Sequence, residues 1–433
     1  MSVRLFRFLW KTGSRWRNPG FKVSYRFLKA TEKLTLNELK EIQFQRLKET
    51  LFFAYQNTEY YNEIFKKVSF IPERDFNSLN DINKVPLTTK YDLLQYNVKV
   101  HSRAKFNRVF KSESSGTSGQ ELKFLKDEPW DSFNRAARFR GFSWYGVNPW
   151  ERNGYLWGYN FAFKEKIKTL ALDKLQNRFR LFSYNEKGIK HFIKKLEKAT
   201  YLSGYSSMIY EIARRINSYQ IKPELQGLKV ICGTSEKIFD SYQPETLKAF
   251  GKRIVSEYGS AESGIIAFEC PYGNMHINME GVYVEEVDNE IIITNLIARS
   301  FPVIRYKLGD YIKLKDPGFE CPCGMKHPII EDVIGRVGKL VYGFNETYPS
   351  LTFYYVFKNL SNIYGLELNY QVSQENKGEL IVKIQQDLPT EHLKLLENEL
   401  IKYFKTDMTF KIIPDQELHE MNGKFVDFIT TVE

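Results

Sequence analysis

Regular alternation of helix-like and strand-like stretches between residues 186 and 259 restricts the fold more than any other feature of the sequence. Helices are predicted over 186–198, 206–219 and 243–250, and each precedes a strand-like run, at 201–205, 228–233 and 253–259. Strands that alternate with helices at this spacing form a parallel sheet covered by helices. Ligands bind such sheets beyond the carboxyl ends of the strands. We therefore expect a ligand site after these strands.

The flanking regions extend this pattern into two domains. Further helices are predicted over 32–67 and 128–144, two strands within 105–125, and a β-rich region over 275–314. After a Gly-containing break at 335–339, strands at 366–372, 380–384 and 410–414 surround an amphipathic helix at 389–404. We predict an α/β fold with a large N-terminal domain over 1–334, made of mixed sheets and covering helices, and a small α+β C-terminal domain over 335–433.

Length and composition exclude several classes of protein. A chain of 433 residues is too long for one compact core. Its aromatic share of 15% argues against disorder, and four cysteines are too few for a disulfide scaffold. No apolar run reaches the roughly 18–20 residues that span a membrane, and Arg7 and Lys11 interrupt the apolar start, unlike a secretory signal. We expect a cytoplasmic protein.

The chain is basic, with a formal net charge of +11, which is compatible with nucleic acid, an anionic membrane or anionic substrates. Cations and aromatic side chains interleave in residues 1–30. Such a segment either lies on an anionic membrane surface or forms an amphipathic helix that covers the main domain. Outside residues 1–30 the charges are mixed in sign, so a nucleic-acid-binding protein is the least favoured class.

A small-residue loop follows an apolar, β-prone run at 109–113 and reads Ser114, Ser115, Gly116, Thr117, Ser118 and Gly119. Glycine and small hydroxyl residues let a backbone approach a ligand closely, and their N–H groups can surround a phosphate. A flexible Ser/Gly linker has the same composition. On this segment alone the two interpretations are equally good.

Three later segments suggest partners for a nucleotide. Tyr258 beside Gly259 could stack on a base, and Glu262, four residues later, could hold Mg²⁺, although such a segment is more often an ordinary turn. Asp310, after Gly309, could accept both ribose hydroxyls, or could mark the tip of a solvated hairpin. Lys424 lies in a Gly-containing loop that domain closure could bring to a reaction centre, whereas most such lysines are merely solvated.

Considered together, these segments match one superfamily in order and spacing. They resemble the phosphate loop (Ser114–Gly119), the aromatic-Gly-x-x-Glu motif (Tyr258–Glu262), the ribose-binding Gly-Asp (Arg305–Asp310), the hinge (Gly335–Lys339) and the catalytic-lysine loop (Asn422–Lys424) of adenylate-forming acyl ligases. Thr58–Tyr61 and Val85–Lys90 resemble the N-terminal signature of the phenylacetate–CoA ligase-like branch, and Gly423–Phe425 is similar to the ending of its capsular-polysaccharide-biosynthesis ligases. The resemblance covers nearly the whole chain after about residue 35.

The resemblance implies a two-step enzyme whose C-terminal domain rotates on a hinge. A carboxylate attacks the α-phosphate of ATP to give an acyl-adenylate and pyrophosphate, and a second nucleophile then displaces AMP. The implied catalytic residues are Lys424, Glu262 and Thr117, with Glu262 also the Mg²⁺ ligand. The implied nucleotide-binding residues are Ser114, Ser115, Gly116, Thr117, Ser118, Gly119, Gly233, Thr234, Ser235, Glu236, Tyr258, Gly259, Ser260, Glu262, Asp310, Arg336 and Lys424.

The second acceptor and the acid are less closely defined. Gln120 stands where many relatives have Lys, Gly338 stands where the hinge is usually acidic or Lys, and no residues identify a CoA site. We expect CoA as the acceptor, with an amino sugar or carrier in surface-polysaccharide assembly as the alternative. The partners are then a small carboxylic acid and the acceptor, with an oligomer and peripheral association with the inner membrane face left open. The acid pocket is expected near Trp144, Tyr155, Trp157, Tyr159 and 203–207.

The cysteines suggest a metal site that does not depend on this resemblance. Cys270, His276, Cys321 and Cys323 lie in two Pro- and Gly-containing turns and supply three thiols and one imidazole. Such a set fills the tetrahedral shell of Zn²⁺ and leaves no open position, which favours a structural ion over a catalytic one. Unrelated cysteines are the alternative. His327 is a spare ligand candidate, and Cys232 is expected in the core.

Overall fold

A computed structural model describes residues 3–114, 121–156, 163–181, 185–236, 238, 242–287, 290–333, 340–366, 368–416, 418, 420–421, 424–425 and 428–432. The chain divides into two compact units. Unit 1 comprises residues 1–112 and 124–336, and unit 2 comprises residues 113–123 and 337–433. Each unit is described below by itself.

A single sheet of 11 strands forms the framework of unit 1, in the order β10-β11-β12-β13-β9-β8-β7-β6-β5-β3-β4. One half is parallel, as the alternating pattern predicted, because β4, β3, β5, β6 and β7 pair in parallel. The other half continues from β8 with antiparallel pairing. The strands are β3 (Asn153–Leu156), β4 (Arg178–Arg180), β5 (Tyr201–Tyr205), β6 (Val230–Thr234), β7 (Ile254–Ser260), β8 (Gly264–Glu269), β9 (Met275–Ile277), β10 (Val282–Val287), β11 (Glu290–Asn295), β12 (Tyr306–Leu314) and β13 (Ile329–Val333).

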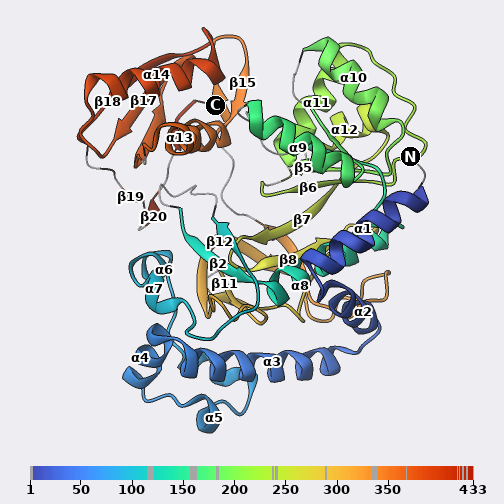
Figure 1. The fold of residues 1–433 in the computed structure, drawn as a ribbon, viewed down its shortest axis with the longest axis vertical. Helices are drawn as coiled ribbons and strands as arrows, with labels where there is room; N and C mark the ends of the chain where they lie inside the picture. Colours follow the sequence, from blue (N-terminus) through green and yellow to red (C-terminus); the bar gives the residue numbers. More distant parts are fainter. Residues whose placement is uncertain are drawn as a thin grey trace. The chain divides into compact units, whose positions relative to one another are not determined.

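Helices cover both faces of the parallel half, as strands buried on two sides require. Val230 and Cys232 of β6 pack against Phe142 of α8 (Glu128–Trp144). Ile231, between them, is fully buried and points to the opposite face because side chains alternate along a strand. Helices α10 (Glu186–Leu196), α11 (Ser206–Ser218) and α12 (Tyr242–Phe250) gather beside β5 and β6 (Figure 1). Cys232 is a core residue, as predicted.

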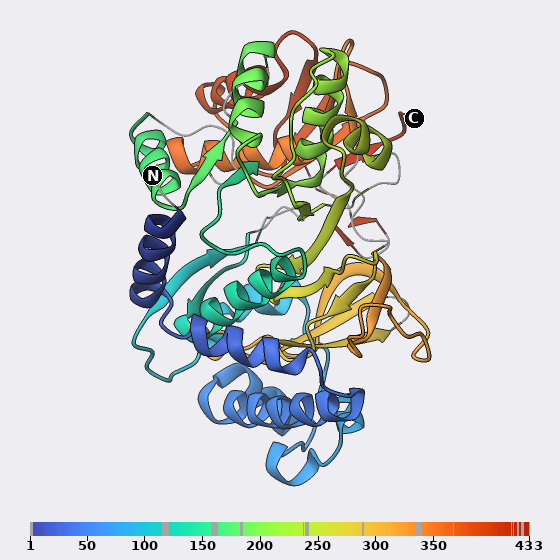
Figure 2. The ribbon, with the colours of Figure 1, turned by 90° about the vertical axis from the view of Figure 1, so that its right-hand side faces the viewer.

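The N-terminal helices pack around α8 and the antiparallel half. They are α1 (Val3–Arg17), α2 (Phe21–Thr31), α3 (Leu36–Asn57), α4 (Glu59–Lys67), α5 (Pro72–Asp75), α6 (Lys90–Gln95) and α7 (Asn97–Val100), with a 3₁₀ helix at Leu79–Lys84. Helix α2 lies along α8 (Figure 2). Thr89 caps α6 through a capping box with Asp92. Thr88 pairs with Tyr306, so the Val85–Lys90 signature is anchored to β12.

Unit 2 contains a small α+β fold. Its four-stranded sheet has the order β18-β17-β16-β21, made of β16 (Tyr370–Gln374), β17 (Glu379–Ile384), β18 (Thr409–Ile413) and β21 (Phe428–Thr430). Helices α13 (Leu351–Tyr364) and α14 (Thr390–Phe404) share one apolar core with the sheet. Short strands β14 (Leu340–Tyr342), β15 (Thr347–Pro349), β19 (Glu420–Met421) and β20 (Lys424–Phe425) pair separately. The predicted strands and the helix at 389–404 are confirmed.

The two strands predicted within 105–125 are confirmed, and two helices were not expected. Strands β1 (Val109–Glu113) and β2 (Lys123–Asp127) form a two-stranded sheet apart from the main one. Helices α9 (Phe163–Leu175) and α13 were not predicted. Helix α13 is strongly apolar along its length, reading Leu-Thr-Phe-Tyr-Tyr-Val-Phe at its start, so its sequence shows little helical periodicity.

Candidate functional site

The predicted nucleotide residues of unit 1 lie where β7 changes from parallel pairing with β6 to antiparallel pairing with β8. Gly233 and Thr234 close β6, and Tyr258, Gly259 and Ser260 close β7. Both segments therefore stand at the carboxyl end of the parallel strands. Ligands of open α/β sheets bind outside this end of the strands.

A direct contact joins two of the predicted segments. The Tyr258 hydroxyl donates a hydrogen bond of 2.8 Å to Oδ2 of Asp310, although the residues are 52 positions apart. Asp310 lies inside β12, with Gly309 before it at a φ of +86°. The hairpin-tip interpretation of this Gly-Asp pair is therefore wrong, because strand β12 continues to Leu314. Glycine is required there because other residues rarely adopt a positive φ.

Glu262 follows the same turn and is 5% exposed. The side-chain amide of Asn295 donates to its backbone oxygen at 2.9 Å and holds the turn against β11. Within the described ranges, no side chain or backbone group donates a hydrogen bond to the Glu262 carboxylate. A buried carboxylate that has no donor among the described residues suits a hard cation such as Mg²⁺.

Lys126 is a neighbour of this carboxylate that the sequence interpretation missed. It is 8% exposed, lies on β2, and stacks its ammonium 4.7 Å from the Trp130 ring centre. Burial lowers its pKa, and the nearby carboxylates of Asp131 and Glu262 oppose that shift. The signal available in the sequence was weak, because Lys126 is one lysine in a strand of alternating pattern.

Glu236 was expected to line an open nucleotide pocket, but its carboxylate is hydrogen-bonded within the fold. Its carboxylate accepts a 2.9 Å hydrogen bond from the backbone N–H of Ser207, in the first turn of α11. Burial raises its pKa, although this hydrogen bond acts in the opposite direction. Ser206 packs so close to Gly233 that a Cβ there would lie 2.6 Å from its hydroxyl oxygen. The Gly233–Glu236 turn is thereby held against the start of α11.

Several predicted residues lie outside the described residues. Ser115, Gly116, Thr117, Ser118, Gly119 and Arg336 belong to this group, as do Gln120, Trp157 and Tyr159. The base of the small-residue loop is described, and the Ser114 backbone N–H donates to the carbonyl of Leu122 at 3.0 Å. Lys424 opens β20, whose backbone pairs with Met421, and the structure does not describe its side chain.

The predicted metal ligands converge at the opposite, amino-terminal end of the parallel strands. The ligand atoms of Cys270, His276, Cys321 and Cys323 all lie within 4.8 Å of one another. The sulfurs of Cys270 and Cys321 are 3.7 Å apart, and the Cys323 sulfur is 3.2 Å from Nε2 of His276. Thiolate ligands about 2.3 Å from a tetrahedral zinc ion would stand about 3.8 Å apart. Burial, with the neighbouring Cys321 and Cys270 thiols, raises the pKa of Cys323 to about 12.

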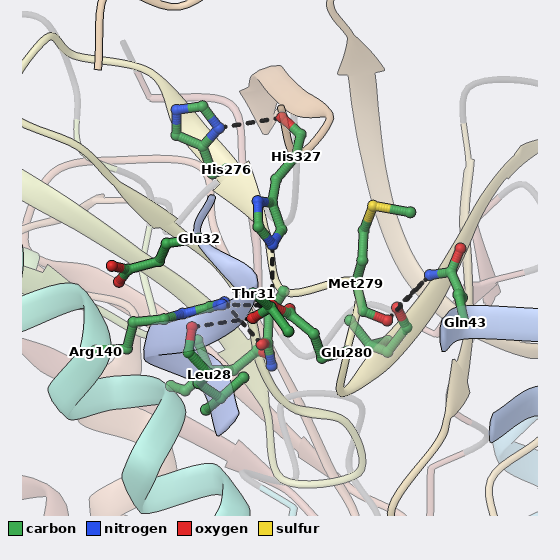
Figure 3. A network of polar contacts seen from close by, with 12 residues as sticks. Leu28, Thr31, Glu32, Gln43, Arg140, His276, Met279, Glu280 and His327 are labelled. Atoms are coloured by element: carbon green, nitrogen blue, oxygen red, sulfur yellow. Dashed lines mark hydrogen bonds and ion pairs between the residues drawn. The ribbon is translucent and has the colours of Figure 1, made fainter. Parts of the chain in front are cut away.

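A buried polar network fixes one of these ligands (Figure 3). Nδ1 of His276 lies 3.1 Å from the backbone oxygen of His327, which leaves Nε2 facing the sulfurs. The His327 ring points the other way, with Nε2 3.0 Å from Oε1 of Glu280. Arg140 of α8 donates to the same oxygen at 2.7 Å. His327 is therefore a support for the cluster and not the spare ligand that we expected.

The same region contains Trp144, which we had expected near the acid pocket. Its ring centre lies 6.4 Å from that of His276, and its indole N–H donates to Glu32 at 2.8 Å. Trp144 therefore belongs to the surroundings of the cysteine cluster, at the end of α8 that lies away from the carboxyl ends of the strands. Tyr155, by contrast, lies on β3 beneath Arg178, whose guanidinium is 4.1 Å from the ring centre.

Comparison with known proteins places this arrangement in context. No family model matches the chain. Protein CapK of Staphylococcus aureus is 27% identical over 314 residues, which cover 69% of this chain and 68% of that protein. Phenylacetate-coenzyme A ligases of Escherichia coli (strain K12) and Aromatoleum evansii match over 62 and 96 residues, at 44% and 35% identity. These two matches span only 14% and 21% of those proteins.

Solved structures match over almost the whole chain. 2-Hydroxyisobutyryl-CoA ligase, in complex with 2-HIB-AMP and CoA, superposes with a TM-score of 0.64 at 17% identity and covers 93% of this chain and 92% of its own. The same protein in its postadenylation state gives a TM-score of 0.59 at 15% identity, over 92% and 91% of the two chains. At such identities the likeness establishes the fold.

The chain therefore shares the fold of 2-hydroxyisobutyryl-CoA ligase. Together with the similarity to CapK and, over short stretches, to phenylacetate-coenzyme A ligases, this fold supports the resemblance to the adenylate-forming acyl ligases and their phenylacetate–CoA ligase-like branch.

Proposed function

We propose that this protein is an ATP-dependent, AMP-forming ligase that activates a carboxylic acid as an acyl-adenylate and transfers the acyl group to CoA. The contact between Tyr258 and Asp310 carries the proposal, because it joins the base-stacking and ribose-binding candidates in one crevice of an adenylate-forming fold. The similarity of short stretches to phenylacetate-coenzyme A ligases supports CoA as the acceptor.

Each described residue of the proposed site has a role that follows from its side-chain chemistry. Tyr258 stacks on adenine, and Asp310, held in place by its hydrogen bond with Tyr258, accepts the ribose hydroxyls at its remaining acceptor positions. Gly233–Glu236 forms a wall of the nucleotide pocket. Glu262 holds Mg²⁺ through its unoccupied carboxylate oxygens, and the ion supplies positive charge beside the phosphates.

Residues outside the described parts complete the proposal. The Ser114–Gly119 loop, including Thr117, wraps the β- and γ-phosphates through its N–H and hydroxyl groups. Arg336 contacts the nucleotide at a hinge over 335–339, about which unit 2 rotates. Lys424 then delivers positive charge to the carboxylate–phosphate junction as negative charge develops in the transition state.

Isotope exchange between ATP and pyrophosphate across a panel of carboxylic acids tests the first step. We expect exchange with at least one acid, followed by AMP release and thioester formation when CoA is added. Exchange without any thioester would mean that the acyl group passes instead to an amino sugar or a carrier in surface-polysaccharide assembly. Two observations support this alternative: the Gly423–Phe425 ending and the similarity to CapK over 69% of the chain. A panel in which no acid supports exchange contradicts the proposal.

We further propose that Cys270, His276, Cys321 and Cys323 hold a structural Zn²⁺. Their spacing fits a closed tetrahedral shell, and packed neutral thiols with raised pKa values are what a divalent cation would convert to thiolates. Metal analysis should find one zinc per chain in the wild type. The Cys321→Ser variant should lose most of it, whereas Cys232→Ala, a change at a core cysteine outside the cluster, should keep it. Equal zinc in both variants, or none in the wild type, rules the site out.

Helix α1 supports a third proposal, peripheral association with an anionic membrane. Phe8 and Trp16 are 65% and 74% exposed, and Arg4, Lys11 and Arg15 flank them on the same helix. Exposed aromatic side chains beside cations are typical of helices that lie in a lipid headgroup layer. None of the described helices is both long and apolar enough to cross a bilayer. The Phe8→Ser/Trp16→Ser variant should lose sedimentation with anionic vesicles; equal sedimentation of variant and wild type contradicts this role.

A further inference from the structure

A hollow of about 420 Å³ opens at the amino-terminal end of the parallel strands. Its walls come from the start of β6 at Lys229 and Val230, from Lys252 and Arg253 before β7, and from the turn that follows β8. Ligand pockets in proteins commonly have volumes of about 300–1,000 Å³. The hollow is therefore large enough for a small organic molecule.

This hollow is separate from the nucleotide crevice. Strand β6 runs from Val230, which lines the hollow, to Thr234 in the crevice, and a strand rises about 3.3 Å per residue. The two ends of β6 therefore lie about 13 Å apart, with a buried sheet between them. A molecule bound in the hollow could not reach the carboxyl end of the strands.

The charge in the hollow is predominantly positive. Lys229, Lys252 and Arg253 line it, and Glu269 is its only carboxylate among the described residues. Glu269 is already engaged, because Oε2 accepts a 2.9 Å hydrogen bond from the Ser256 backbone N–H. Within the described part of the chain, neither Lys252 nor Arg253 donates a side-chain hydrogen bond, whereas Lys229 donates one to the carbonyl of Gly146 at 2.5 Å.

The remaining wall is apolar and aromatic. Val230 and Val255 form a buried floor, with exposed fractions of 2% and 8%. Tyr272 stands at the rim with 61% of its surface exposed, in a turn made possible by the positive φ of Gly273. An aromatic ring at a rim offers its face to a sugar or a base.

We propose that this hollow is a second ligand site for a phosphorylated small molecule, a sugar phosphate or a nucleotide, distinct from the ATP site. The phosphate lies against Lys252 and Arg253, with Lys229 completing the positive wall, and the organic part lies against Tyr272 and the valine floor. Adjacent cations bind a phosphate better than a carboxylate, because a phosphate carries more charge and more acceptor oxygens.

Calorimetric titration of the full chain tests the site, with glucose 1-phosphate and uridine 5′-monophosphate as probes and saturating AMP present to fill the nucleotide crevice. We expect saturable binding of at least one probe. Lys252→Gln/Arg253→Gln should weaken it tenfold or more. The control Lys187→Gln/Lys194→Gln removes the same charge from exposed positions on α10 and should leave it unchanged.

Two further measurements distinguish a nucleotide from a sugar phosphate as the ligand. Tyr272→Ala should weaken the nucleotide more than the sugar phosphate if a base stacks on the ring, and the reverse order assigns the sugar phosphate. Inorganic phosphate that binds as tightly as both probes, equal affinities in the two double variants, or no saturable heat overturns the proposal. The Lys252→Gln/Arg253→Gln variant should keep ATP–pyrophosphate exchange within twofold of wild type, so a failure of the ligase proposal would be seen independently.

Discussion

The two ends of the parallel strands in unit 1 are built in opposite ways. At the carboxyl end, Tyr258 comes from β7, Asp310 from β12 and Glu262 from the turn after β7, and the Glu262 carboxylate has no hydrogen-bond donor among the described residues. At the amino end, Arg140, Glu280 and the cysteine cluster are buried and mutually bonded. The carboxyl end presents Glu262 and the Tyr258–Asp310 pair to a ligand, whereas the buried Arg140–Glu280 pair at the amino end holds secondary structure together, apart from the cationic hollow on that side.

This difference predicts which substitutions should change activity and which should change stability. Changes at Asp310 and Glu262 should alter kinetics more than the free energy of unfolding, because these carboxylates are proposed to bind the nucleotide and its metal ion. Changes in the Arg140–Glu280 pair should do the reverse, because removal of one partner from a buried ion pair leaves the other uncompensated.

The largest effect is expected from Lys424→Ala, which tests whether a residue of unit 2 acts with the carboxyl end. Loss of its charge in the transition state should reduce ATP–pyrophosphate exchange by about 10³-fold or more. ATP binding, measured by calorimetry, and the thermal midpoint should stay near wild type. Exposed Lys402→Ala, elsewhere in unit 2, is the matched control. Retained exchange in Lys424→Ala would remove this lysine from the mechanism.

Next in size is Glu280→Gln at the amino end. The Glu280 carboxylate accepts from Arg140 and His327, and the Arg140 partner is what brings its pKa below the usual range against the opposing effect of burial. Its removal should lower the free energy of unfolding by about 3 kcal/mol or more, measured by urea denaturation. Glu331→Gln breaks an exposed pair with Lys313 on the same sheet and should leave the free energy of unfolding nearly unchanged, because water and salt screen exposed ion pairs. Equal costs for the two variants would contradict the contrast.

A smaller effect is expected from Asp310→Ala. Because its carboxylate is proposed to accept the ribose hydroxyls, the KM for ATP should rise about tenfold or more, since charge-assisted hydrogen bonds contribute about 1.5–3 kcal/mol. A 2′,3′-dideoxyribose analogue of ATP, which lacks both hydroxyls, distinguishes the role: its KM should be similar in variant and wild type. If both nucleotides are weakened equally, Asp310 does not contact the ribose.

Tyr258→Phe should have the smallest effect. It removes only the 2.8 Å hydrogen bond to Asp310 and keeps the ring for stacking, so the KM for ATP should rise about threefold to tenfold, equivalent to about 1 kcal/mol. Tyr258→Ala removes the ring as well and should have a clearly larger effect. If the two variants have the same KM for ATP, the ring does not stack on adenine, and Tyr258 is not part of the nucleotide site.

Much of this molecule could be predicted from local pattern. The helix at 128–144, the three helix–strand pairs and the Thr89 cap follow from periodicity and capping chemistry, which act over a few residues. The four candidate metal ligands could be singled out from the sequence because three thiols and one imidazole make a complete zinc ligand set, and their ligand atoms do converge. Helix α13 could not be predicted, because it is apolar on nearly every side and only its tertiary packing defines its buried face.

The sequence alone determined the parallel sheet with ligand loops after its strands, and it determined which side chains are available. These are Tyr258, Glu262 and Asp310 for a nucleotide, and the three cysteines and His276 for a metal ion. The tertiary structure decided which of these groups meet. It joined Tyr258 to Asp310, turned His327 toward Glu280, and moved Trp144 to the cysteine cluster. These pairings depend on strand order and register between segments more than 40 residues apart, which local propensity does not encode.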